Sequence, residues 1–358
     1  MRSRLVTAFR QTVGSALLVV ASWLVAGEAH AQRMDLALSR LRITAEDPAV
    51  VPDTACPSSF AGGLRRDWCS DDVAWRRLMT QFAGGLIPPI LLPAHTRGMR
   101  GIYVGIESFI TGVSADDESW ARGTEGDGPD SRNRFVDQVI AWQRINARKG
   151  LPFGFELGAS LGFAANTSYW TLGTEVRWAL LEGLRDRNTS VYFPSVSVRG
   201  AVQALVGDPE VNVTVPSIDV SVGERFILGD TVELSPYVGA QVAWVFGDTE
   251  LVDLTPERDA YNECNPSPSL PGAPGGPPLG TEAPYCRGDG TDFNHNVVFP
   301  RIRSMRARVF AGAQVRYEWF ALTGAFAFDA AAPHDLDASL PSDLPRQWSV
   351  NLGAGVSY

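Results

Sequence analysis

Charged side chains recur at alternate positions within segments that are otherwise rich in apolar residues, glycine and serine. Eight residues show this pattern: Glu107, Glu156, Glu175, Arg177, Arg199, Glu233, Arg306 and Arg308. An uncompensated charge in a confined interior is costly, whereas a carboxylate and a guanidinium group that meet there compensate each other. Because the set holds four residues of each sign, it predicts ion pairs across a polar interior. An open ion path would instead tend to carry rings of one sign.

Catalytic chemistry has weak support in this sequence. After residue 31 the histidines are His95, His295 and His334. Of these, only His334 is followed directly by an acid, Asp335. A general base needs an orienting partner within hydrogen-bonding reach. The Gly-x-Ser-x-Gly string at residues 158–162 lies inside an expected strand, and not at the strand-to-helix turn that forms the nucleophile elbow of many hydrolases. We therefore expect a non-enzymatic protein. The alternative is a hydrolase with a rim active site that uses His334 together with Asp116, Asp117 or Asp292.

Metal ligands are sparse. Residues 288–294 offer oxygen ligands but lack the EF-hand spacing. A weak calcium site there is the alternative to our expectation of no metal and no cofactor.

The four cysteines, Cys56, Cys69, Cys264 and Cys286, form no CxxC pair, so a zinc site is not expected. In an exported chain we expect disulfides instead, with the sequence-local pairing Cys56–Cys69 and Cys264–Cys286, because short loops cost least entropy to close.

The first 31 residues have the pattern of a secretory signal peptide. Arg2, Arg4 and Arg10 precede an apolar run over residues 13–26, and residues 29–31 form a small-x-small cleavage site. The run is short for a membrane-spanning helix, so we expect cleavage after Ala31.

The whole chain has a net charge of −9 and a single lysine, Lys149. This acidic balance argues against a nucleic-acid partner.

Strict alternation of apolar with small or polar residues predicts β-strands along most of the chain. Ten strands are expected, over residues 101–112, 135–145, 153–163, 170–180, 192–204, 216–228, 232–246, 305–317, 320–328 and 348–358. Every long connection follows an odd-numbered strand, and every even-numbered strand is followed by a short turn. That one-sided distribution is typical of bacterial membrane barrels, with long extracellular loops and short periplasmic turns. It also predicts that both chain ends lie on the periplasmic side.

The last strand carries the most specific signal. Trp348, Leu352, Val356 and Tyr358 lie on its apolar face, and Tyr358 is the last residue printed. This ending resembles the terminal strand of Gram-negative outer-membrane β-barrels, where a C-terminal aromatic residue belongs to the signal read by the insertion machinery. The resemblance implies an all-β, antiparallel, up-and-down transmembrane barrel of about ten strands (range 8–12). It also implies an outer-membrane location and contact with outer-membrane lipid and lipopolysaccharide. We expect a monomer. A soluble secreted β-sandwich that binds a ligand is the alternative.

Residues 32–96 do not resemble barrel strands. Residues 71–82 have helical spacing, with Asp71 or Asp72 as the N-cap and Pro88-Pro89 after the helix. We expect a periplasmic lid or a plug inside the lumen, and we favour the lid because a narrow barrel has little room for a helix. The barrel would then occupy residues 97–358.

The interior and the longest loop suggest the role of the protein. Ten strands enclose a narrow space that paired charges would fill, although a narrow solute path remains the alternative. The extracellular loop 247–301 contains a Pro/Gly-rich stretch over 265–284 that cannot pack a core, and it is either a protease-resistant flap or a binding loop. We therefore expect a structural or narrow-channel protein of the outer membrane.

Overall fold

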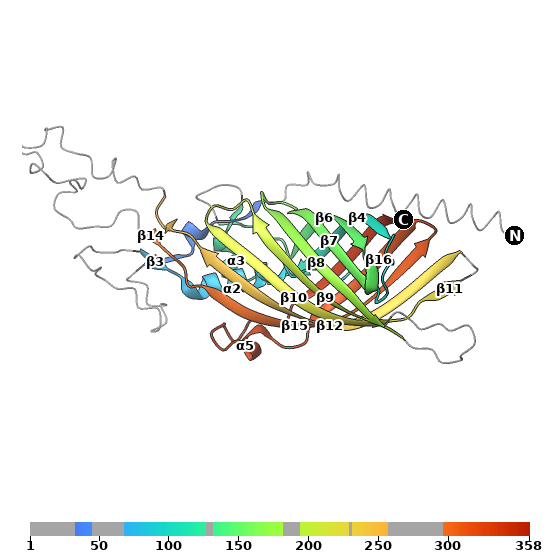
Figure 1. Ribbon diagram of the computed structural model, residues 1–358. Coiled ribbons are helices and arrows are strands. Elements are labelled where there is room, and N and C mark those ends of the chain that lie inside the picture. Colours follow the sequence, from blue (N-terminus) through green and yellow to red (C-terminus); the bar gives the residue numbers. More distant parts are fainter. Residues whose placement is uncertain (1–32, 45–67, 127–131, 182–193, 229–230, 257–295) are drawn as a thin grey trace, which may run out of the picture.

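The computed structural model describes residues 33–44, 68–126, 132–181, 194–228, 231–256 and 296–358. Ten antiparallel strands form a closed barrel (Figure 1), as the alternation predicts. They are β4 (Ile102–Gly112), β6 (Val139–Gly150), β7 (Phe155–Ala164), β8 (Trp170–Leu181), β9 (Ser195–Val206), β10 (Val211–Gly223), β12 (Val232–Thr249), β15 (Ile302–Tyr317), β16 (Phe320–Asp329) and β17 (Trp348–Ser357). Each strand pairs with its neighbours in this order.

The last strand closes the barrel onto the first. The β17–β4 register runs from Ser349 opposite Thr111 to Ser357 opposite Tyr103. Beyond it, Tyr358 and Ile102 exchange two backbone hydrogen bonds of 2.8 Å each. This closure rules out the β-sandwich alternative, because the two sheets of a sandwich keep unpaired edges.

The strand boundaries differ from expectation mainly in β6. We expected this strand over 135–145, but it starts at Val139 and continues to Gly150. Its second half alternates Arg144, Asn146 and Arg148 inward with Ile145 and Ala147 outward. Because Asn146 and Arg148 are polar or charged, the sequence after residue 145 resembles a surface turn unless the barrel interior is known to be polar. The β10 boundaries also shift, since residues 226–228 form a separate short strand, β11 (Phe226–Leu228), that pairs only with β12.

The outer surface of the barrel is apolar between its two ends. On the outward-facing positions of the ten described strands, charge occurs only at Lys149, at one end, and at Asp248 and Arg303, at the other. Exposed aromatic residues mark both ends. Phe163, Trp170, Phe246 and Trp348 lie near the long connections, and Phe153, Trp178, Trp319 and Tyr358 lie near the short turns. An apolar band between two aromatic girdles is the surface that a lipid bilayer requires of a barrel.

A small folded cap lies at the end of the barrel that carries the long connections. We use "cap" for residues 33–44 and 68–85 together with residues 113–126, against which they pack. Its elements are β1 (Arg33–Leu36) paired with β5 (Thr124–Gly126), η1 (Leu38–Arg40), β2 (Arg42–Thr44) paired with β3 (Trp68–Ser70), α2 (Asp72–Gly84) and α3 (Glu118–Gly123). Outside the cap lie the single-turn elements η2 (Pro152–Gly154) and α5 (Pro333–Leu336), and the short strands β13 (Val252–Asp253) and β14 (Asn296–Val297) pair with each other.

Helix α2 forms where its spacing predicts and fits into the barrel mouth. The Asp71 side chain caps it by accepting a 2.9 Å hydrogen bond from the Ala74 amide. Trp75 and Phe82 are fully buried, and the Phe82 ring lies edge-on to Trp142 of β6. Among the described residues, no helix is both long enough and apolar enough to cross a membrane.

The expected position of the N-terminal segment is wrong. We expected a lid at the short-turn end, but α2 contacts the opposite end, where the Ser114 amide donates a 2.7 Å hydrogen bond to Gln81. The two described ends of the chain therefore lie at opposite ends of the barrel. The cause is an eleventh passage of the chain, by residues 86–97, which runs through the lumen from α2 toward β4.

A glycine at the closing seam gives a test of this packing. A Cβ on Gly355 would lie 2.6 Å from the Tyr103 ring, so we expect Gly355→Leu to lower the free energy of unfolding by about 1–3 kcal/mol. The matched control is Ala354→Leu, because Ala354 is the next residue and faces outward. Urea titration in lipid vesicles measures both, and equal effects of the two substitutions would contradict the described seam.

Candidate functional site: a filled barrel lumen

The eight charges with alternating spacing all lie inside the barrel. Their side chains belong to residues that are 0 to 8% exposed: Glu107, Glu156, Glu175, Arg177, Arg199, Glu233, Arg306 and Arg308. The structure does not bring them together as a simple set of four pairs. Each is instead part of a network that includes further residues.

The largest network crosses one wall of the barrel. Glu107 of β4 accepts hydrogen bonds from Arg144 (2.6 Å) and Arg148 (2.7 Å) of β6. Arg148 also contacts Glu175 of β8, which accepts a 2.9 Å bond from Arg199 of β9. Each buried carboxylate thus meets two guanidinium groups, and the network extends over several strands.

Arg199 and Arg177 both have a carboxylate on one side and the lumen on the other. Arg199 donates a 2.8 Å bond to Asp219 of β10, and Arg177 pairs with Glu156 of β7. The planar guanidinium group carries five N–H donors, so one arginine can satisfy a carboxylate and still have donors for another acceptor.

Two smaller networks lie nearer the ends of the barrel. At the cap end, Asp329 accepts bonds from Arg306 (2.5 Å) and Arg308 (2.9 Å), and Arg306 also donates to Gln347 (2.9 Å). At the short-turn end, Glu233 contacts Arg316 (2.6 Å) and His95 (3.1 Å). The imidazole of His95 therefore contacts a carboxylate inside the barrel.

Our sequence reasoning missed several of the partner residues. Arg144, Arg148, Asp219 and Asp329 are 0 to 4% exposed and all carry ion pairs. Asp219 stands between the outward-facing Ile218 and Val220, so the alternation of the strand indicates that Asp219 faces inward. Asp329 lies one residue beyond its predicted strand, and Arg148 lies beyond the predicted end of the β6 strand at residue 145. Arg144 lies inside that predicted strand, but we did not count it among the interior charges.

The space between these networks is occupied by residues 86–97, which we call the lumen segment. It has no regular secondary structure, and its residues are buried from Leu86 to Ala94. Wall side chains donate hydrogen bonds to its backbone carbonyls. Gln241 donates to Pro88 (3.0 Å), Arg199 to Pro89 (2.9 Å), Tyr237 to Ile90 (3.1 Å), and Arg177 to Pro93 (2.5 Å) and His95 (3.0 Å). The interior charges thus pair with one another and also hold this segment.

Both ends of the lumen segment are fixed. At the cap end, Arg306 donates to the Thr80 carbonyl (2.8 Å), at the C-terminal half of α2. At the other end, the Arg97 amide donates to Glu156 (2.8 Å), and the Arg97 guanidinium lies 4.5 Å from the centre of the Tyr103 ring. Of the two expected arrangements, lid or plug, the one we favoured is therefore wrong for residues 86–97. Helix α2 itself packs against inward-facing wall residues at the cap end, and the extended lumen segment continues from it.

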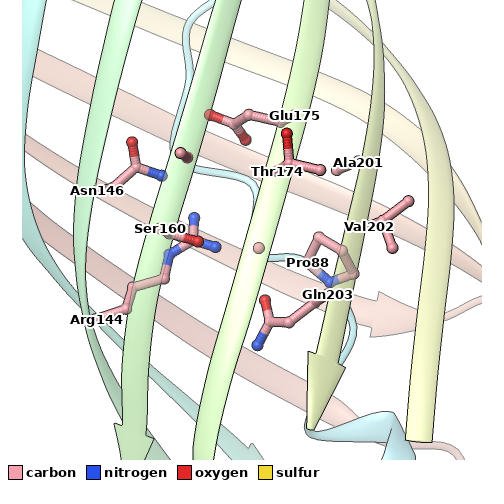
Figure 2. Close-up of a pocket in the computed structure, with 11 residues that line it drawn as sticks. Pro88, Arg144, Asn146, Ser160, Thr174, Glu175, Ala201, Val202 and Gln203 are labelled. Carbon is pink, nitrogen blue, oxygen red and sulfur yellow. The ribbon is translucent and has the colours of Figure 1, made fainter. Parts of the chain in front are cut away.

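A small polar cavity remains between the lumen segment and the wall (Figure 2). It has a volume of about 10 Å³ and lies beside Pro88, among strands β6 to β9. Gln203 and Asn146, both 1% exposed, present amide groups around it. This volume is about what one water molecule needs, so the cavity can hydrate these amides but has no room for a solute.

A larger cleft of about 770 Å³ opens at the cap. It lies between η1 and the connections that hold Tyr169 and Asp208–Glu210. Burial raises the pKa of Glu210, and the nearby carboxylates of Asp208 and Asp253 raise it further. In the part of the chain that the structure describes, no group of three or more His, Cys, Asp or Glu side chains is arranged to hold a metal ion.

The candidate rim residues are only partly described. His334 and Asp335 contact each other at 3.1 Å, with side chains 33% and 48% exposed. Asp116 is exposed, whereas Asp117 is paired with Arg77 of α2 (3.1 Å). Asp292, His295 and residues 288–294 lie outside the described residues.

The structure describes one of the four cysteines. Cys69 is disulfide-bonded, whereas Cys56, Cys264 and Cys286 lie outside the described residues, as do the signal peptide and the Pro/Gly-rich stretch. Both disulfide pairings therefore stay predictions.

Trp348, Leu352, Val356 and Tyr358 all face outward, 38 to 91% exposed, which leaves the expected insertion signal on the lipid-facing side of β17.

Comparison with known proteins gives structural likeness only. No family model matches the chain, and no curated protein matches it. The attachment invasion locus protein Ail of Yersinia pestis is 10% identical over 72% of this chain and 97% of its own, with a TM-score of 0.25. The KdgM porin is 8% identical over 72% of this chain and 99% of its own, with a TM-score of 0.26. The outer membrane protease OmpT from Escherichia coli is 11% identical over 74% of this chain and 99% of its own, with a TM-score of 0.19.

These TM-scores are too low to support any inference about this chain. The assignment therefore rests on the structure itself: a closed ten-stranded antiparallel barrel, an apolar belt between aromatic girdles, and a polar interior. This is the fold of a Gram-negative outer-membrane β-barrel.

Removing one lumen arginine tests the interior networks. Arg199→Met leaves the Asp219 carboxylate and the Pro89 carbonyl without their buried donor, so we expect the free energy of unfolding to fall by about 3–5 kcal/mol. Arg301→Met is the matched control. Arg301 is 78% exposed, and its loss should change stability by no more than about 0.5 kcal/mol. Urea unfolding in vesicles measures both, and a small loss for Arg199→Met would contradict the described network.

The contact between α2 and α3 predicts a pH dependence of the cap. Burial raises the pKa of Asp117, but hydrogen bonds from Ser119 and Arg77 outweigh it, so the pKa lies below its ordinary value of 3.8. A carboxylate with a lowered pKa adds stability that is complete above its ordinary value and disappears as the pH falls through the lowered one. We expect protease resistance of the cap to fall with the pH in this acidic range, and Asp117→Asn to remove part of that dependence. An unchanged pH profile in Asp117→Asn would contradict the assignment.

Proposed function

We propose that this protein is an outer-membrane barrel that anchors a surface cap and does not conduct solutes. The single observation that supports this function most strongly is the lumen segment, which occupies the interior of the barrel and is bonded to its wall. The only lumen cavity described above, beside Pro88, has room for about one water molecule.

The energetics favour a permanently filled interior. Withdrawing the segment would leave the donors of Arg177, Arg199, Tyr237 and Gln241 without their carbonyl partners. Unpaired buried donors each cost about 1–3 kcal/mol, and more when they are charged. Water entering the lumen would recover part of this cost, but it would not replace the apolar contact of Ile90 and Leu91 with Tyr237 and Phe310.

The orientation and partners form part of the same proposal. Long connections face the outside in bacterial barrels, so the cap would lie at the cell surface and Lys149 on the periplasmic side. The apolar belt would contact outer-membrane lipid and lipopolysaccharide, and the insertion machinery would read the outward face of β17. We propose a monomer with no nucleic-acid partner, cofactor or catalytic role, exported by a cleaved signal peptide.

Planar-bilayer recording of the refolded protein tests this function. We expect the wild-type barrel to give no stable conductance steps. The double substitution Arg177→Met and Arg199→Met should loosen the lumen segment and produce steps. The matched double substitution Arg301→Met and Arg303→Met, on the outside, should stay silent. Heat-modifiable migration in detergent gels shows that each variant is folded. Large, stable steps from the wild-type barrel would overturn the proposal in favour of a channel.

A further inference from the structure

The lumen segment connects two points of the chain that lie at opposite ends of the barrel. Before it, the cap contacts the long-connection end, where Gln347 donates hydrogen bonds to the carbonyls of Gln81 and Gly112 (both 3.0 Å). At the last residue of the segment, Arg97 donates a 3.0 Å bond to Ser357, at the short-turn end. Residues 86–97 therefore span the barrel from one mouth to the other.

The closed wall leaves the lumen as the route between the two ends. Every neighbouring pair of the ten strands is hydrogen-bonded, including β17 with β4 and β10 with β12. The lumen segment cannot leave sideways without breaking one of these pairings. We propose that the lumen is a passage through which the chain carries its own N-terminal segment across the membrane. The cap residues that precede the lumen segment, 33–44 and 68–85, are thereby delivered to the outer side. The outward direction rests on the orientation given under the proposed function.

The hydrogen bonds in the lumen suit a passing chain because they are made largely to its backbone. Five carbonyls accept bonds from wall side chains, those of Pro88, Pro89, Ile90, Pro93 and His95. A backbone carbonyl is present at every residue, so donors arranged in this way can bind successive parts of an extended chain. The polar side-chain contacts lie at the end of the segment, where His95 meets Glu233 and Arg97 meets Glu156.

The composition of the segment suits the same role. The wall strands already pair with one another, so a chain inside them cannot join the sheet and must satisfy its polar groups through side chains. Pro88, Pro89 and Pro93 have no backbone N–H and keep the chain extended, which removes three donors that the lumen would otherwise have to satisfy. The folded cap then prevents the segment from sliding back.

Amine labelling on whole cells tests this crossing, because the chain has one lysine, Lys149. Val73→Lys places an amine in α2, before the lumen segment, at a site 38% exposed. Met99→Lys places one directly after the segment, at a site 59% exposed. A membrane-impermeant amine reagent is applied to intact and to permeabilised cells, and peptide mapping locates the label. Heat-modifiable migration shows that both variants fold.

We expect the lysine at position 73 to be labelled on intact cells, and the lysines at positions 99 and 149 only after permeabilisation. Equal labelling at positions 73 and 99 under both conditions would overturn the crossing. Labelling of position 99 but not 73 on intact cells would overturn the outward direction, and with it the proposed orientation. Neither result depends on conductance, so failure of the crossing is distinguishable from failure of the filled-lumen function.

Discussion

The structure depends on the hydrogen-bond donors that the barrel wall presents to its own interior. The inward positions of this barrel are largely polar or charged, so apolar side chains do not fill its interior. The barrel is also too narrow to hold a folded domain. Guanidinium groups solve this problem, because each can bind a carboxylate on the wall and a carbonyl of a chain in the centre. Arg177 and Arg199 do both. Without these donors, the extended segment would have unsatisfied carbonyls and the carboxylates would have unpaired charge.

This constraint links the fold to the proposed role. The same arginines that compensate Glu156, Glu175 and Asp219 also hold residues 86–97, so barrel stability and lumen closure are coupled. The segment continues directly from α2, which packs against inward-facing wall residues at the cap end. The cap, the filled lumen and the polar wall therefore form one structural unit, which the apolar outer belt places in a membrane.

Much of the barrel could be predicted from the sequence because strand alternation is a local signal. The period of two identified the ten strands, and the uneven connection lengths gave their up-and-down order. The eight alternating charges also lie inside. The predictions failed where contacts between distant parts of the chain, and not the local sequence, determine the structure. The path of the N-terminal segment depends on hydrogen bonds to its backbone carbonyls. Every residue has a carbonyl, so no sequence pattern indicates which of them will accept such bonds. The C-terminal boundary of β6 was missed because Asn146 and Arg148 resemble turn residues unless the interior is known to be polar. Pro88, Pro89 and Pro93 were a usable signal for an extended segment, but we took them only as a helix stop.

The most direct test of this account is the distance between the wall arginines and the lumen segment in a lipid bilayer. Solid-state NMR can measure dipolar coupling between ¹³C-labelled proline carbonyls and ¹⁵N-labelled arginine side chains in the reconstituted protein. The account predicts coupling at hydrogen-bonding range for Pro89 with Arg199 and for Pro93 with Arg177, and loss of the first coupling in Arg199→Met. Absence of both couplings in the folded wild-type protein would show that the segment is not held by the wall, and would contradict the filled lumen.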